Sequence, residues 1–170
     1  MDREYMHKDE ADGYEYEDDE NNMVAFLEDY TEDISTASLF FRELSGYVQN
    51  IGARKRAPEY FMNTPWDTII DCADNLFLQV ADPINFNGLT RLQKYGVLIA
   101  VFSIVLKNFT DYAEFYMPFG QYMYYLDERG IDMNDQQEED LRRFIVNIEI
   151  EILTAVNWVP CPTFRQRGLF

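Results

Sequence analysis

The residue types that most often carry catalysis or hold a metal ion are few and scattered in this sequence. His7 is the sole histidine, so histidine-based acid–base catalysis and histidine-rich metal sites are excluded. Cys72 and Cys161 lie far apart and neither forms a C-x-x-C pair, so we expect reduced, buried thiols rather than a redox or zinc motif. The sequence contains no phosphate-binding loop and no calcium-loop spacing. We therefore expect no enzyme activity, no catalytic residues, no metal and no cofactor.

The acidic residues are concentrated at the N-terminal side of the chain. The net charge is −17, and residues 1–33 account for −12 of it, which leaves −5 for the other 137 residues. Because nucleic-acid affinity comes largely from lysine and arginine displacing counterions, this balance argues against direct binding of DNA or RNA. Residues 1–22 combine like charges with few aliphatic side chains, so the sequence predicts a disordered acidic tail there.

No segment has the pattern of a secretion signal or a membrane anchor. The acidic N-terminus has no apolar h-region, and the longest apolar run, at residues 95–106, is too short to span a bilayer. We expect a soluble, intracellular protein of the nucleus or cytoplasm, with no membrane contact.

Hydrophobic periodicity indicates five helices in one all-α domain. Apolar residues recur at helical spacing, caps and prolines mark the boundaries, and no alternating β-pattern or internal repeat competes. The third helix is apolar on nearly every side between Val97 and Leu106, which is typical of a central helix wrapped by others. Pro118 and Gly120 split or delay the fourth helix. The predicted helices span residues 35–51, 64–80, 89–108, 113–126 and 134–157.

Two other segments keep alternative interpretations. Residues 23–34 mix apolar and acidic side chains, which suits a short amphipathic helix or a docking segment. The connector at residues 53–58 carries Arg54, Lys55 and Arg56, which favours a solvated loop, with an anion-binding patch or an import signal as the alternative.

The last part of the fifth helix and the residues after it resemble the cyclin box. The sequence NIEIEILTAVNWVPCPTF has a glutamate followed four residues later by leucine, an aromatic residue about nine positions after the glutamate, and a Pro-Thr pair that ends the box. The matching residues are Glu149, Leu153, Trp158 and Pro162-Thr163.

The third helix is also similar to a cyclin segment. The sequence LQKYGVLIAVFSIVLKNFTD begins with Leu-Gln, continues through Gly-Val and small apolar residues, and ends with a serine and a lysine before an acidic residue. Lys107 takes the place of the family's kinase-contacting lysine, with two more residues after Gly96 than in the family pattern.

The first two helices add a weaker match. Arg42 and Asp74 correspond to an arginine and an aspartate that pair internally in the family, although the later leucine and tryptophan of the family's docking motif are absent. The resemblance spans about residues 35–164 and leaves residues 165–170 as a C-terminal tail.

This resemblance implies a single five-helix cyclin-like box that binds and activates a cyclin-dependent protein kinase, as a heterodimer rather than a homo-oligomer. Such a regulator favours the kinase conformation in which the αC helix is packed inward and its glutamate reaches the catalytic lysine. By the same resemblance, Lys107 and Glu149 contact kinase backbone groups. Ile150, Leu153 and Trp158 supply apolar contacts, with Trp158 as the best hot-spot candidate.

Four of these residues also have a purely structural interpretation. Glu149 could be exposed and unpaired, Lys107 could cap the third helix through the helix dipole, and Leu153 and Trp158 could belong to the core. At the level of function, one alternative is a kinase-binding adaptor or inhibitor, such as a viral or parasite protein, that keeps the box without activating the kinase. The other is a transcription-factor-type cyclin fold, which needs a basic face.

Overall fold

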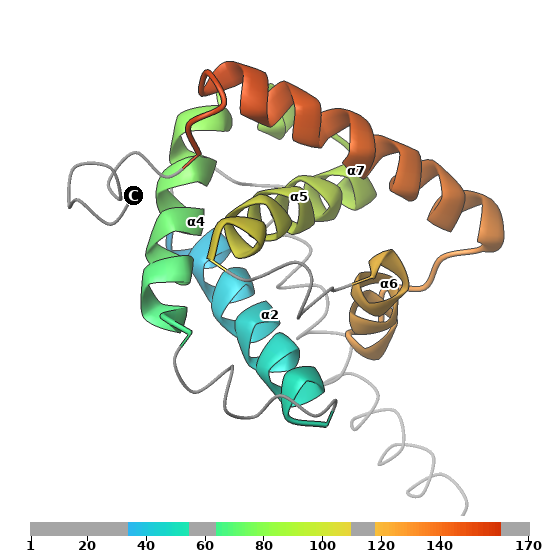
Figure 1. Ribbon diagram of the computed structural model, residues 1–170. Helices are drawn as coiled ribbons and strands as arrows, with labels where there is room; N and C mark the ends of the chain where they lie inside the picture. The colour runs from blue at the N-terminus through green and yellow to red at the C-terminus, as the bar shows by residue number, and fades with distance from the viewer. Residues whose placement is uncertain (1–33, 55–63, 110–117, 161–170) are drawn as a thin grey trace, which may run out of the picture.

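The described part of the chain is helical and contains no strand (Figure 1). The computed structural model describes residues 34–54, 64–109 and 118–160. A short 3-10 helix, η1 (Phe86–Gly88), joins the second and third of five α-helices. These are α2 (Ile34–Arg54), α4 (Trp66–Val80), α5 (Arg91–Phe109), α6 (Phe119–Glu128) and α7 (Asp135–Ala155).

The all-α class predicted from the sequence is confirmed, and each helix overlaps the segment predicted for it. α6 begins directly after Pro118, which is its N-cap residue. Proline has no backbone N–H to bond to a preceding helical turn, so the helix does not extend further toward the N-terminus. The predicted acidic tail at residues 1–22 lies outside the described residues. So do residues 23–33, most of the basic connector, and Cys161 with the Pro162-Thr163 pair.

Capping boxes mark the starts of α5 and α7. Asn134 Oδ1 accepts a hydrogen bond from the Gln137 backbone N–H at 2.8 Å, and Gln137 Oε1 accepts one from the Asn134 N–H at 3.0 Å. Thr90 and Gln93 make the same reciprocal pair before α5, at 3.3 and 3.0 Å. Each capping box satisfies N–H groups that a helix start leaves without an intrahelical partner.

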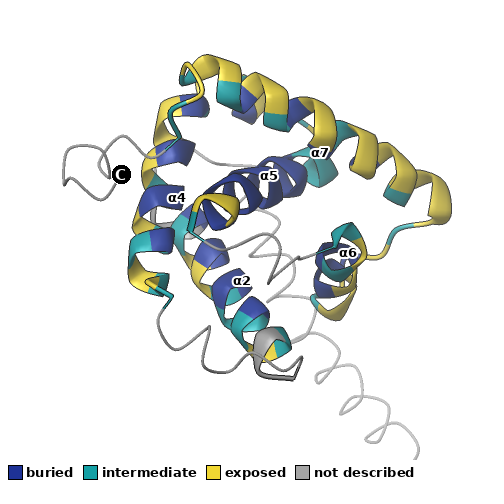
Figure 2. Ribbon diagram, in the orientation of Figure 1, coloured by how far each residue is buried: buried dark blue, intermediate teal, exposed yellow. Residues whose placement is uncertain are grey.

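The core is built around α5, which lies between α4, α2 and α7 (Figure 2). Its buried stretch runs without a break from Lys94 to Leu106, as the all-round apolar pattern predicted. The full helix of 19 residues is long and apolar enough to cross a membrane by length and composition. The apolar run at residues 95–106, which is too short to span a bilayer, is the central part of this longer helix, and the burial of α5 inside the bundle is that of a core helix.

Two contacts hold α2 against α4. Ser38 Oγ donates a hydrogen bond to Asp74 Oδ2 at 2.9 Å, and the rings of Phe41 and Phe77 lie edge to face with centroids 6.3 Å apart. Phe41 also stacks on Phe102 of α5, with centroids 6.5 Å apart, which ties this pair to the central helix.

α6 is fastened to α2 by polar and aromatic contacts. Arg129, at the end of α6, forms an ion pair with Glu43, and both side chains are about one third exposed or less. The Tyr47 hydroxyl donates to Gln121 Oε1 at 3.3 Å, and the rings of Tyr47 and Tyr125 lie 5.1 Å apart. α6 therefore closes the bundle on the side away from α4 (Figure 1).

Candidate functional site

α5 and α7 pack closely against each other at a glycine. A Cβ added at Gly96 would lie 2.8 Å from Phe144 Cδ1 and 2.9 Å from Leu141 Cδ1. Glycine is the residue type that permits such close packing of one helix against another, since any larger side chain meets these atoms. Further along both helices, Lys107 of α5 meets Glu149 of α7, so the two helices run in the same general direction.

The ion pair between Lys107 and Glu149 joins the two polar residues that the sequence singled out. The Lys107 Nζ and Glu149 Oε1 atoms are 3.7 Å apart, and the two side chains are 49% and 23% exposed. Lys107 also lies in the last turn of α5, where a cation is favoured by the helix dipole. Glu149 is therefore paired, and the interpretation of it as an exposed, unpaired acid is wrong.

Apolar side chains surround Glu149 on the outer face of α7. Val146, Glu149, Ile150 and Leu153 fall within an arc of about 100° on a helix with 3.6 residues per turn. Val146 and Ile150 are 56% and 54% exposed, whereas Leu153 is half-buried and packs against the core. We call these four residues the α7 face. Its opposite side holds Leu141, Ile145, Ile148 and Ile152 in the core.

Trp158 follows the end of α7 in an uncommon backbone conformation. Asn157 and Trp158 have φ angles of 53° and 62°, in the left-handed region that tryptophan rarely adopts. The Trp158 backbone N–H donates to the Leu153 carbonyl at 2.7 Å, which reverses the chain beside the last turn of the helix. The indole is 63% exposed, so Trp158 is a surface residue and its interpretation as a core residue is wrong.

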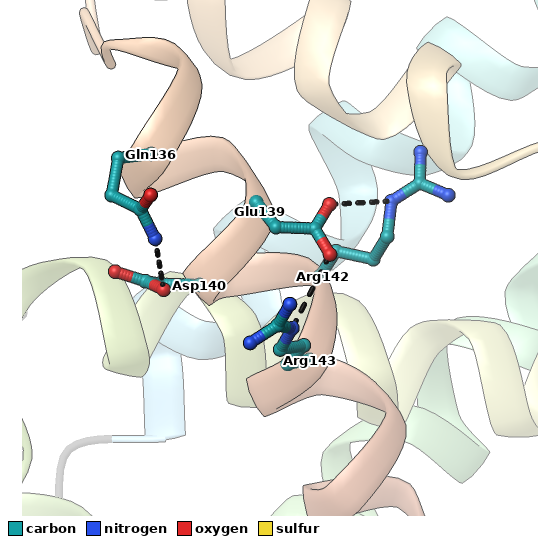
Figure 3. A network of polar contacts seen from close by, with 5 residues as sticks. All are labelled: Gln136, Glu139, Asp140, Arg142 and Arg143. Carbon is teal, nitrogen blue, oxygen red and sulfur yellow. Dashed lines mark hydrogen bonds and ion pairs between the residues drawn. The ribbon is translucent and has the colours of Figure 1, made fainter.

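The first half of α7 carries a network of polar contacts that precedes the α7 face (Figure 3). Glu139 pairs with Arg142 at 4.0 Å and with Arg143 at 3.3 Å, and Gln136 Nε2 donates to Asp140 Oδ1 at 2.9 Å. These pairs are spaced three or four residues apart, as helix neighbours are, and they stabilise this exposed part of α7. The Arg142 guanidinium also lies over the Phe119 ring of α6, 4.6 Å from its centroid.

The predicted internal pair between Arg42 and Asp74 is not formed as an ion pair in the described residues. Asp74 Oδ2 accepts from Ser38, Oδ1 is buried without a hydrogen-bond partner, and Arg42 is exposed. Burial raises the pKa of Asp74 above its ordinary value, while the Ser38 hydrogen bond lowers it, Asp71 raises it and the more distant Arg42 charge lowers it. In place of the predicted arginine, the hydroxyl of Ser38, one turn before Arg42, donates to one oxygen of the carboxylate.

Taken together, the structure brings Lys107, Glu149, Ile150 and Leu153 to one surface formed by α5 and α7. The sequence reasoning missed Val146, which extends this surface by one turn. The signal was present: Val146 is four residues before Ile150 and is off the apolar stripe that predicts the core.

No group of three or more His, Cys, Asp or Glu residues that could hold a metal ion occurs in the described ranges. Cys72 is buried in the core, and Asp74 is half-buried beside Ser38. The arrangement of the α7 face, with an ion pair among exposed apolar side chains, is instead suited to binding another macromolecule. In comparisons with known proteins, no family model, no curated protein and no solved structure matches this chain.

Proposed function

We propose that this chain is a cyclin-like regulatory subunit that binds a cyclin-dependent protein kinase and activates it. The proposed contact surface consists of the α7 face, Lys107 and Trp158. The proposal is supported by the sequence resemblance in the third and fifth helices and by one structural observation. Lys107 and Glu149, 42 positions apart in the sequence, lie 3.7 Å apart beside the exposed Ile150.

This geometry suits the roles that the resemblance implies. An ion pair between partly exposed side chains is weak. Breaking it so that each charged group can bind a backbone group of the partner therefore costs little free energy. Ile150 and Trp158 are more than half exposed and gain most from being covered. Aromatic side chains at the centre of an interface are the ones that most often carry its binding energy, which favours Trp158 as the anchor.

In the proposed mechanism the chain supplies no reacting group. It binds better to the kinase conformation with the αC helix packed inward and so shifts the population of the kinase toward that conformation. The cost of ordering the kinase is offset by apolar burial against the α7 face and Trp158, while Lys107 and Glu149 fix the orientation of the docked helix.

The experiment is reconstitution of the full chain with cyclin-dependent kinases, followed by measurement of binding and of phosphoryl transfer. Glu149→Lys and Trp158→Ala are expected to weaken binding by about tenfold or more, as hot-spot substitutions do. Glu151→Lys is the matched control, because it makes the same charge change two residues along α7 on a side that lies about 140° from Val146.

The alternatives predict different outcomes of the same experiment. An adaptor or inhibitor would bind the kinase through Glu149 and Trp158 without raising its activity. A transcription-factor-type fold would bind DNA in a salt-sensitive way and would not bind a kinase. Failure of every kinase to bind the full chain, in a preparation with native helix content, would refute the proposal.

A further inference from the structure

The order of charged and apolar residues along α7 has a symmetry of its own. Val146 and Ile150 are 56% and 54% exposed and lie on successive turns of the helix. Arg142 lies four residues before Val146, and Glu149 lies three residues after it. An α-helix turns about 100° and rises about 1.5 Å per residue. Arg142 therefore projects about 40° to one flank of Val146, about 6 Å before it along the helix axis. Glu149 projects about 60° to the same flank, about 4.5 Å after it.

We propose that this face binds a second copy of the chain, with the two α7 helices packed antiparallel about a two-fold axis close to Val146. A two-fold axis places residues that precede the axis in one copy opposite those that follow it in the other. Arg142 of each copy then lies opposite Glu149 of the other, on the same flank. Val146 meets its own counterpart at the axis.

The existing contacts of these residues allow this exchange. Arg142 is 4.0 Å from Glu139, and Glu149 is 3.7 Å from Lys107, so neither pair is tight. Arg142 is 56% exposed while its guanidinium rests on the Phe119 ring, which limits its freedom before it meets the second copy.

The overall charge opposes association and gives the proposal a distinctive salt dependence. Each chain carries −17, of which residues 1–33 hold −12, so two copies repel at long range. This repulsion is screened beyond a Debye length of about 8 Å at physiological ionic strength, whereas close pairs inside an interface are screened less. The dimer is therefore expected to strengthen between low and physiological salt.

Formation of this dimer would cover Glu149 and Ile150. If the α7 face also binds a kinase, a consequence that rests on the proposed function, the two partners compete and the kinase is bound by the monomer. The concentration of the chain would then set how much of it is available to the kinase.

The test is sedimentation velocity of the full chain across a dilution series at physiological ionic strength. The unmodified chain is expected to exchange between monomer and dimer. Val146→Asp and Arg142→Glu should each raise the dimer dissociation constant about tenfold or more. The double change Arg142→Glu with Glu149→Arg should recover most of the dimer, because both pairs across the axis are rebuilt with reversed sign.

Leu39→Asp provides the control, since Leu39 is 54% exposed on α2, away from α7. It should leave the dissociation constant unchanged, and circular dichroism should show native helix content in all variants. A chain that stays monomeric at every concentration, or a dimer that Val146→Asp leaves intact, overturns the proposal.

The same variants separate this inference from the proposed function. Arg142 is outside the proposed kinase contacts, so Arg142→Glu is expected to lose the dimer and keep kinase binding. If no kinase binds while the dimer follows the predicted pattern, the proposed function alone fails. If the kinase binds and no dimer forms, the dimer alone fails.

Discussion

Gly96 of α5 packs so closely against Phe144 of α7 that a Cβ at position 96 would lie 2.8 Å from Phe144 Cδ1. Leu141 Cδ1, from the preceding turn of α7, would be 2.9 Å away. This approach sets the spacing between the two helices on which the proposed site is built. Lys107 and Glu149 lie further along the same helices, so their 3.7 Å separation depends on the spacing at Gly96.

Gly96→Ala is therefore expected to destabilise the protein. Overpacking costs about 1–3 kcal/mol, and the better helix propensity of alanine returns about 1 kcal/mol, so a net loss of about 1 kcal/mol is expected in urea unfolding. Gly46→Ala in α2 is the control, because a Cβ there meets nothing within 4 Å. It should gain roughly 0.5–1 kcal/mol. Equal gains at both positions would show that α7 yields to the extra methyl group.

The Lys107–Glu149 ion pair is expected to contribute little to stability. Its side chains are 49% and 23% exposed, and pairs of this kind typically contribute less than about 1 kcal/mol. A double-mutant cycle with Lys107→Ala and Glu149→Gln should give a coupling of about 0.5 kcal/mol in urea unfolding. A coupling above about 2 kcal/mol would instead mark the pair as a structural element of the bundle.

Asp74 is expected to make stability depend on pH. Burial raises its pKa in the folded state above the ordinary value of 3.8, so the folded state holds the proton more tightly than the unfolded state. The contribution of this group is therefore most favourable below pH 3.8 and is lost as the pH rises through the raised pKa. The loss persists at neutral pH.

Asp74→Asn keeps an oxygen that can accept the Ser38 hydrogen bond and removes the buried charge. Its free energy of unfolding, relative to the unmodified chain, should increase as the pH rises from about 4 and level off above the raised pKa. Denaturant unfolding across this pH range measures the difference. Asp82→Asn, in the exposed turn after α4, controls for the change in net charge. A constant difference between Asp74→Asn and the unmodified chain would contradict the prediction.

Asn134 is expected to stabilise the start of α7. Its side chain accepts from the Gln137 N–H at 2.8 Å, and loss of such a cap costs about 1 kcal/mol. Thermal unfolding of Asn134→Ala should show a lower midpoint, while Asp132→Ala, in the exposed turn before it, should leave the midpoint nearly unchanged. Similar losses in both variants would mean that the turn as a whole, rather than the cap, determines this boundary.

Helix positions followed from the sequence because periodicity and caps are local signals. The all-round apolar character of α5 also predicted its central place, since only burial on every side suits such a helix. Val146 was missed because most apolar residues of α7 form the stripe that faces the core. An apolar residue outside that stripe does not change the predicted helix. Its exposure depends on which side of α7 faces α5.

The contacts between helices were harder to predict. Lys107 and Glu149 meet only because α5 and α7 run in the same direction, and this orientation depends on the connection between them. Arg42 and Asp74 were paired by their resemblance to the family, but Ser38, one turn before Arg42 on α2, donates the hydrogen bond to Asp74. The left-handed backbone at Trp158 has no sequence signal, because glycine and asparagine are the residues that usually adopt it.

The burial of α5 has a consequence for the newly made chain. Part of its apolar surface is covered by α7, which begins at Asp135, after residues 110–134 have been added. Until then the ribosome presents a long apolar helix whose covering helix has not been synthesised. Chaperones bind transiently exposed apolar surface of this kind, and the same surface promotes aggregation. The interval between completion of α5 and completion of α7 is therefore the period in which synthesis of this protein is most vulnerable.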